Sequence, residues 1–116
     1  AAILAAPCCQ HELHGKLKNE ALRAVLRQGI LRERMADIVT DTLRALALRI
    51  MGYRTTVVEF VSPESTSKNL MIRAEWGVKP GQPGVVGEYK DLKAFWNVTP
   101  AIERMLGDPF RLYLKN

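Results

Sequence analysis

The sequence predicts an α/β fold, and three observations carry that prediction. Residues 1–6 form an uninterrupted apolar run, which is typical of a strand buried on both faces in the middle of a parallel sheet. Residues 31–50 repeat apolar side chains at steps of three and four, which indicates a long amphipathic helix. Residues 53–61 and 68–76 are rich in β-branched and aromatic side chains, so we expect two further strands there.

Length and composition indicate one ordinary globular domain of 116 residues, 47% of them hydrophobic. No apolar stretch approaches the ~20 residues of a membrane helix, and residues 1–7 lack the basic start and the length of a secretory signal. The 17 Lys and Arg residues outnumber the 12 Asp and Glu residues, a balance compatible with a polyanionic partner such as RNA. The arginines are spread along helical segments, where a solvated face is the simpler interpretation. We expect a cytoplasmic protein that does not enter a membrane.

The long helix is the clearest of the helical predictions. Residues 16–28 have only a loose helical spacing, and Gly29 interrupts it. On the opposite face of the long helix, Asp41 and Arg44 are expected to form a surface ion pair. Gly52 stands just beyond the last periodic residue, in the place of a helix C-cap. The apolar stripe comprises Met35, Ile38, Val39, Leu43, Leu46, Ala47 and Ile50.

The second half of the chain is expected to begin with a pair of antiparallel strands and to end in helices. The Ser- and Thr-rich stretch 62–67 separates the two strands, and it is short enough for the second strand to run antiparallel to the first. Residues 77–87 hold four Gly and two Pro residues, the composition of a flexible connector. Short helices are expected at 88–97 and 99–106, with Thr99 and Pro100 at a helix start. We therefore divide the chain into an α/β unit (1–76), a linker (77–87) and a helical, aromatic tail (88–116).

The segment Pro7-Cys8-Cys9-Gln10-His11 follows the first strand directly. In open α/β sheets the ligand crevice lies beyond the carboxyl ends of such strands, so chemistry is expected here. Zinc is disfavoured because adjacent cysteines cannot easily point at one ion and a second ligand pair is absent from the sequence. A disulfide between Cys8 and Cys9 is not expected, because neighbouring residues on an extended chain point to opposite faces. The cysteine count instead agrees with a reducing compartment.

Three roles remain for this segment. Cys9 and His11 share a face of an extended chain and could form a thiolate–imidazole pair. A cysteine at a strand end is more often a small buried hydrophobic residue. The role that suits the segment best is a polar wall that holds a substrate against a cofactor. We take Cys9 and His11 as the candidate catalytic residues, and as substrate-binding residues Pro7, Cys8, Gln10 and, at the start of the third strand, Lys68 and Asn69.

Four stretches together resemble the C-terminal half of class I S-adenosylmethionine-dependent methyltransferases. They are Ala-Pro-Cys-Cys-Gln-His-Glu-Leu (6–13), Gly-Ile-Leu-Arg-Glu-Arg (29–34), Thr-Asp-Thr-Leu-Arg-Ala (40–45) and Glu-Phe-Val-Ser-Pro-Glu-Ser-Thr-Ser-Lys-Asn-Leu-Met-Ile-Arg (59–73). The resemblance covers residues 1–74. A related Cys-Cys-His segment occurs in tRNA ribose methyltransferases, which favours RNA as the substrate.

The resemblance implies a Rossmann-like sheet of seven strands, of which this chain supplies strand five (1–6), strand six (53–61) and strand seven (70–76). The seventh strand of that sheet is antiparallel and lies between the fifth and the sixth, and crossover helices join the strands. The family's glycine-rich cofactor loop lies upstream, and the chain has no G-x-G-x-x-G motif. We therefore expect a substrate-side half that binds S-adenosylmethionine weakly by itself.

Two further expectations follow. Without the upstream half, the first strand would expose an unpaired edge through which the chain self-associates. A rival function is a non-catalytic interaction module that docks a protein or RNA partner.

Overall fold

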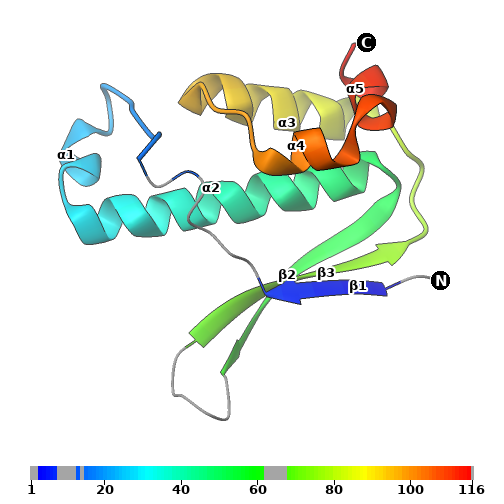
Figure 1. Ribbon diagram of the computed structural model, residues 1–116, viewed down its shortest axis with the longest axis horizontal. Coiled ribbons are helices and arrows are strands. Elements are labelled where there is room, and N and C mark those ends of the chain that lie inside the picture. The colour runs from blue at the N-terminus through cyan, green and yellow to red at the C-terminus, as the bar shows by residue number, and fades with distance from the viewer. Residues whose placement is uncertain (1–2, 8–12, 14, 62–67, 116) are drawn as a thin grey trace.

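The computed structural model describes the backbone of residues 3–7, 13, 15–61 and 68–115, and the side chains of residues 13, 15–58 and 72–115. Figure 1 shows eight elements in this part of the chain. They are β1 (Ile3–Pro7), α1 (Arg23–Leu26), α2 (Gly29–Ile50), β2 (Tyr53–Val61), β3 (Lys68–Trp76), α3 (Pro83–Trp96), α4 (Ala101–Leu106) and α5 (Asp108–Leu114).

The three strands form one sheet in the order β1-β3-β2. β3 is antiparallel to both neighbours, so β1 and β2 run parallel to each other. In the register, Pro7 pairs with Met71, and Val61 pairs with Lys68. The mixed α/β class, the bounds of β2 and β3 and the central antiparallel position of β3 are confirmed. β1 lies at an edge of this sheet, and the expected self-association through it stays a prediction.

The long helix α2 lies between the sheet and the helices α3 to α5, so the molecule has three layers (Figure 1). Its buried side chains recur at helical spacing and include Ala36, Val39, Leu43, Ala47 and Ile50. The inner face of the sheet presents buried Ile72 and Ala74. Most of the predicted stripe is therefore confirmed.

Two predictions for α2 are wrong. Ile38 is 56% exposed, because the amino-terminal half of α2 extends past the sheet (Figure 1). Asp41 is only 2% exposed and is not a surface residue. A helix packed between two layers buries a wider arc than one apolar stripe, and that arc includes Thr40 and Asp41.

α2 ends two residues before Gly52, as the position of this glycine in the sequence predicted. Gly52 has a φ of +110°, which an L side chain rarely adopts. Its carbonyl accepts hydrogen bonds from the N–H groups of Gly77 (3.2 Å) and Val78 (3.1 Å). A Cβ at this position would stand 2.9 Å from Cζ3 of Trp76. The glycine thus lets the helix end and the end of β3 approach closely.

The predicted connector 77–87 is wrong in its second half, because α3 begins at Pro83 and includes Gly84 and Gly87. Pro83 fits the first turn of a helix, where its missing N–H costs nothing. Val85, Val86 and Tyr89 are buried, and this burial outweighs the cost of about 1 kcal/mol for each helical glycine.

Other helix boundaries also differ from the prediction. The loose spacing over 16–28 forms only the four-residue α1, because buried Leu13 and Leu17 anchor the preceding segment as irregular chain. The helix expected at 99–106 begins at Ala101, after Pro100 in the N-cap position with extended backbone. A further helix, α5, follows it.

The tail packs on the long helix. The buried core combines side chains of α2 with Val85, Val86 and Tyr89 of α3 and with Phe110 of α5. The rings of Tyr89 and Phe110 meet edge to face, with centroids 5.3 Å apart. The Gly81 N–H donates to the carbonyl of Ile50 (2.8 Å). The division of the chain into domains stays a prediction.

Candidate functional site

The sheet end predicted to carry chemistry is described at the level of the backbone. Cys8, Cys9, Gln10 and His11 lie outside the described residues. Pro7 ends β1, and Lys68 and Asn69 begin β3; the side chains of these three are also outside the description.

The register settles one part of that prediction. Because Pro7 pairs with Met71, the carboxyl end of β1 and the amino end of β3 lie at the same end of the sheet. The backbones of Pro7, Lys68 and Asn69 therefore lie at the same end of the sheet, and the roles of all seven candidate residues stay predictions. Leu13, fully buried, then fixes the chain to the core shortly after the candidate segment.

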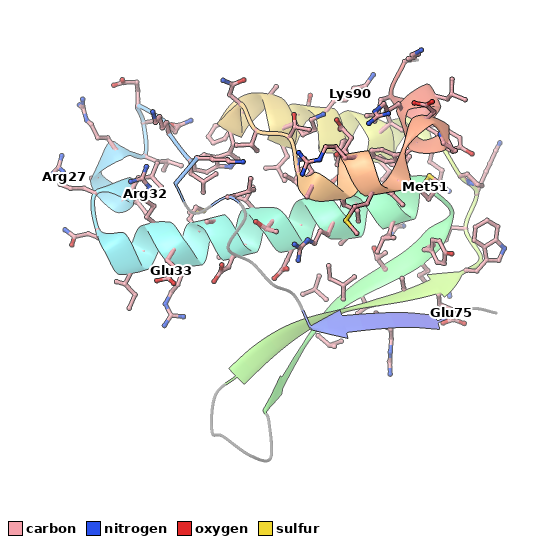
Figure 2. All side chains as sticks on the ribbon, viewed as in Figure 1. Arg27, Arg32, Glu33, Met51, Glu75 and Lys90 are labelled. Carbon is pink, nitrogen blue, oxygen red and sulfur yellow. The ribbon has the colours of Figure 1, made fainter. Side chains whose placement is uncertain are left out.

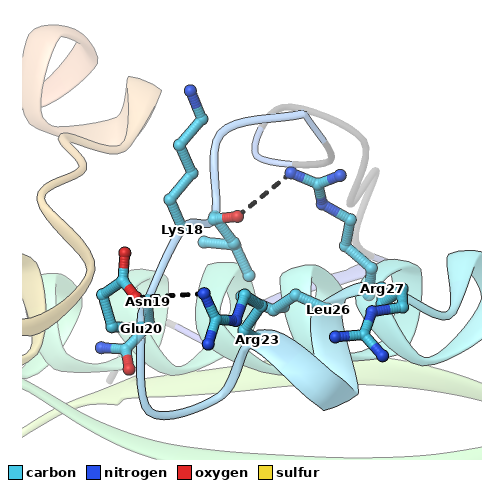
Figure 3. A pocket seen from close by; sticks show the side chains of 8 residues that line it. Lys18, Asn19, Glu20, Arg23, Leu26 and Arg27 are labelled. Carbon is cyan, nitrogen blue, oxygen red and sulfur yellow. Dashed lines mark hydrogen bonds and ion pairs between the residues drawn. The ribbon is translucent and has the colours of Figure 1, made fainter.

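A hollow of about 360 Å³ opens farther along the chain, beside α1 (Figure 3). We call it the basic hollow. Leu17 and Leu26, which are 0% and 8% exposed, supply apolar lining. The remaining lining residues are polar or charged: Lys18, Asn19, Glu20, Arg23, Arg27 and Arg32.

Local hydrogen bonds give the basic hollow its shape. The side-chain oxygen of Asn19 accepts from the N–H of Leu22 (3.3 Å), just before α1 begins. From α2, Arg32 reaches back and donates through Nη2 to the carbonyl of Leu17 (3.2 Å). The Nε of Arg32 is buried and has no hydrogen-bond partner among the described residues. A guanidinium has five N–H donors, so Arg32 can keep its hydrogen bond to the Leu17 carbonyl and still donate to a ligand.

The charges of the basic hollow are poorly balanced. Four cationic side chains face one carboxylate, Glu20. The pair between Arg23 Nη1 and Glu20 Oε2 spans 3.5 Å, and its side chains are 72% and 93% exposed. Such an exposed pair is weak and does little to offset the positive field.

The sequence contained a signal for this hollow that we did not use. Residues 16–34 carry six Lys and Arg residues and two Glu residues, so this segment holds a net charge of +4 out of the chain's +5. Arg23 and Arg27 are exposed, as the solvated-face interpretation predicted, and together with the half-buried Arg32 they line one hollow. A count of charge in successive windows would have found them.

A second hollow, of about 300 Å³, lies between α3 and the turn before α4 and is lined by Lys90, Lys93, Ala94, Asn97, Val98 and Thr99. Here the charge of Lys93 is balanced. Lys93 Nζ lies 2.5 Å from Glu103 Oε1, and the Tyr89 hydroxyl donates to the same oxygen (3.0 Å). Lys93 also lies over the Tyr89 ring, 5.3 Å from its centroid. These contacts join α3 to α4, which indicates a structural role.

No group of three His, Cys, Asp or Glu side chains that could hold a metal ion occurs in the described part of the chain. Among the described turns, 77–82 joins a strand to a helix and contains two glycines, but the Tyr113 ring fills the space beside Gly81.

None of the helices that the structure describes has both the length and the apolar character needed to cross a bilayer. Comparison of the chain with models of protein families, with curated proteins and with solved structures finds no match.

Proposed function

We propose that this chain is the C-terminal region of an S-adenosylmethionine-dependent methyltransferase that acts on RNA in the cytoplasm. The observation that carries the proposal is the strand order β1-β3-β2, with β3 antiparallel between two parallel strands. The resemblance of residues 1–74 implies this order for strands five, seven and six. Because β1 and β2 are parallel and joined through a long helix, a simple meander of hairpins would not produce it.

In this proposal the chain contributes the substrate side of the crevice. The carboxyl end of β1 opens at the edge of the sheet where ligands bind in α/β folds. Pro7, Cys8 and Gln10 would form a wall there, with Cys9 and His11 as the candidate catalytic groups. Lys68 and Asn69 would approach from the start of β3, on the same rim.

The cofactor would supply the methyl group, and the residues that bind it would lie upstream of this chain. The chain's own turns support that division, because they contain no G-x-G-x-x-G motif and the 77–82 turn is filled by Tyr113. The chain alone is therefore expected to be inactive.

The proposal is tested on the parent protein. The DNA upstream of the Ala1 codon should continue the reading frame and encode a strand, a glycine-rich turn and a helix. The purified parent should then transfer tritiated methyl groups from S-adenosylmethionine to RNA. A stop codon followed by an unrelated gene, or a parent that binds the cofactor and labels no RNA, would contradict the proposal.

The second candidate is a non-catalytic module that docks an RNA or protein partner. The basic hollow favours it, because unbalanced cationic charge can bind without catalysis. The upstream reading frame separates the two candidates, since the module needs no glycine-rich cofactor loop.

A further inference from the structure

The excess of cations in the basic hollow is confined to one end of the molecule. Figure 2 labels Arg27 and Arg32 beside the α1 end of α2, while Lys90 lies over the opposite half of that helix. Outside residues 16–34, cationic and acidic side chains differ by only one charge. A ligand attracted by this chain's net charge is therefore drawn to the basic hollow.

The types of side chain indicate what kind of anion fits. Three of the four cations are arginines, whose planar guanidinium groups match the oxygens of a phosphate in a two-pronged arrangement. The hydrogen bond to the Leu17 carbonyl already restrains the Arg32 side chain, so Arg32 loses little conformational entropy when a ligand binds. The buried Arg32 Nε is a donor in need of an acceptor.

The surface around these side chains suits a flexible polymer. Lys18, Arg23 and Arg27 are exposed and can follow a backbone that passes across the hollow. Leu17 and Leu26 are 0% and 8% exposed, so they form the floor of the hollow and leave little apolar surface for a base. None of the described residues that line the hollow is aromatic, so binding is expected to depend on phosphates rather than on base stacking.

We propose that the basic hollow binds the phosphate backbone of RNA. The choice of RNA rests on the proposed function, whereas the choice of phosphate rests on the hollow itself. Lys18, Arg23, Arg27 and Arg32 supply the contacts, and the contact is independent of base sequence.

The test is fluorescence anisotropy with the 116-residue chain and a labelled single-stranded RNA of 20 nucleotides, over a range of salt concentrations. The variant combines Lys18→Gln with Arg27→Gln, two exposed side chains for which the structure shows no role in the fold. The matched control combines Lys79→Gln with Arg104→Gln, which removes the same charge from exposed positions outside the hollow.

The hollow variant should bind RNA at least about tenfold more weakly, and its slope of log K against log salt should fall by about 1.4, or 0.7 for each single-strand phosphate contact. The control should change affinity less than threefold, a limit set by screening of distant charges. Equal losses in variant and control would overturn the proposal, because binding would then follow net charge alone. Binding to phosphatidylserine vesicles without binding to RNA would also overturn it.

Failure of this test can be told apart from failure of the proposed function, since the assay requires no methyl transfer. Hollow-dependent RNA binding by a parent with no methyltransferase activity would refute only the reaction. Methylation of RNA that is unaffected by the hollow variant would refute only the assignment of the hollow.

Discussion

Both hollows are lined by lysine or arginine side chains, but they differ in how far neighbouring carboxylates neutralise that positive charge. Between α3 and α4, Lys93 is four-fifths buried and is matched by Glu103, which also accepts the Tyr89 hydroxyl. In the basic hollow, four cations face the single exposed carboxylate of Glu20. A neutralised, buried charge fixes elements of the fold, whereas an excess of exposed charge remains available to a partner. We therefore expect changes in the carboxyl-terminal layer to affect stability, and changes at the amino-terminal end to affect binding and turnover.

The largest expected effect on stability is that of Phe110→Ala. Phe110 is fully buried and packs edge to face on Tyr89, so its removal leaves a cavity between α5 and α3. The variant should lose about 3–5 kcal/mol of unfolding free energy in a urea titration followed by circular dichroism. Leu112→Ala is the control on the same helix, because Leu112 is 61% exposed and should cost little. Equal losses would mean that α5 is not part of the core.

The largest expected effect on function is that of His11→Ala in the parent protein, under the proposed methyltransferase function. If His11 positions the substrate or moves a proton, turnover should fall by about 10²-fold or more. Affinity for S-adenosylmethionine should hardly change, since the proposed function places the cofactor contacts upstream of this chain. Arg104→Gln is the control, because Arg104 is exposed and lies on α4, outside the candidate site. Wild-type turnover in a folded His11 variant would remove this residue from the site.

Gly81→Ala tests how the tail is attached to α2. Gly81 has a φ of +70°, and a Cβ there would lie 2.6 Å from Cδ1 of Tyr113. The substitution should therefore destabilise the chain by about 1–3 kcal/mol. Gly84→Ala is the opposite case: this helical glycine has open space around it, so alanine should stabilise by up to about 1 kcal/mol. Thermal unfolding of the two variants should thus shift in opposite directions, and a shift in the same direction would contradict this account.

The smallest expected effect compares the two ion pairs directly. Glu103→Gln leaves the largely buried Lys93 without its counter-charge and should cost about 1–3 kcal/mol. Glu20→Gln breaks the exposed pair with Arg23 and should change stability by less than about 0.5 kcal/mol. Glu20→Gln should also strengthen RNA binding, because Glu20 is the one carboxylate among the described residues that line the basic hollow. Equal effects of the two substitutions on stability would break the comparison between the hollows.

The sequence predicted β2 and β3 well because their β-branched and aromatic residues are bounded by clear breaks. It failed at α3, where Gly84 and Gly87 indicated a connector although burial of Val85, Val86 and Tyr89 forms a helix. It also failed at Asp41, because a periodic pattern does not reveal that a second layer covers the helix. Burial between layers depends on contacts distant in sequence, which local patterns do not report.

For the candidate site, the sequence identified the end of β1 and the start of β3, and the register brings these backbones to one rim. It missed the basic hollow because the contributing side chains come from a loop, a short helix and the start of a long one. These side chains come together in the folded chain, in which Leu13 and Leu17 are buried in the core.

The central claim is that this chain supplies the substrate side of a methyltransferase whose cofactor site lies upstream. Calorimetric titration of S-adenosylmethionine into the parent protein and into the 116-residue chain tests it most directly. We expect micromolar binding of one equivalent by the parent and no comparable binding by the chain alone. Micromolar affinity of the isolated chain, or no binding by the parent, would contradict the account.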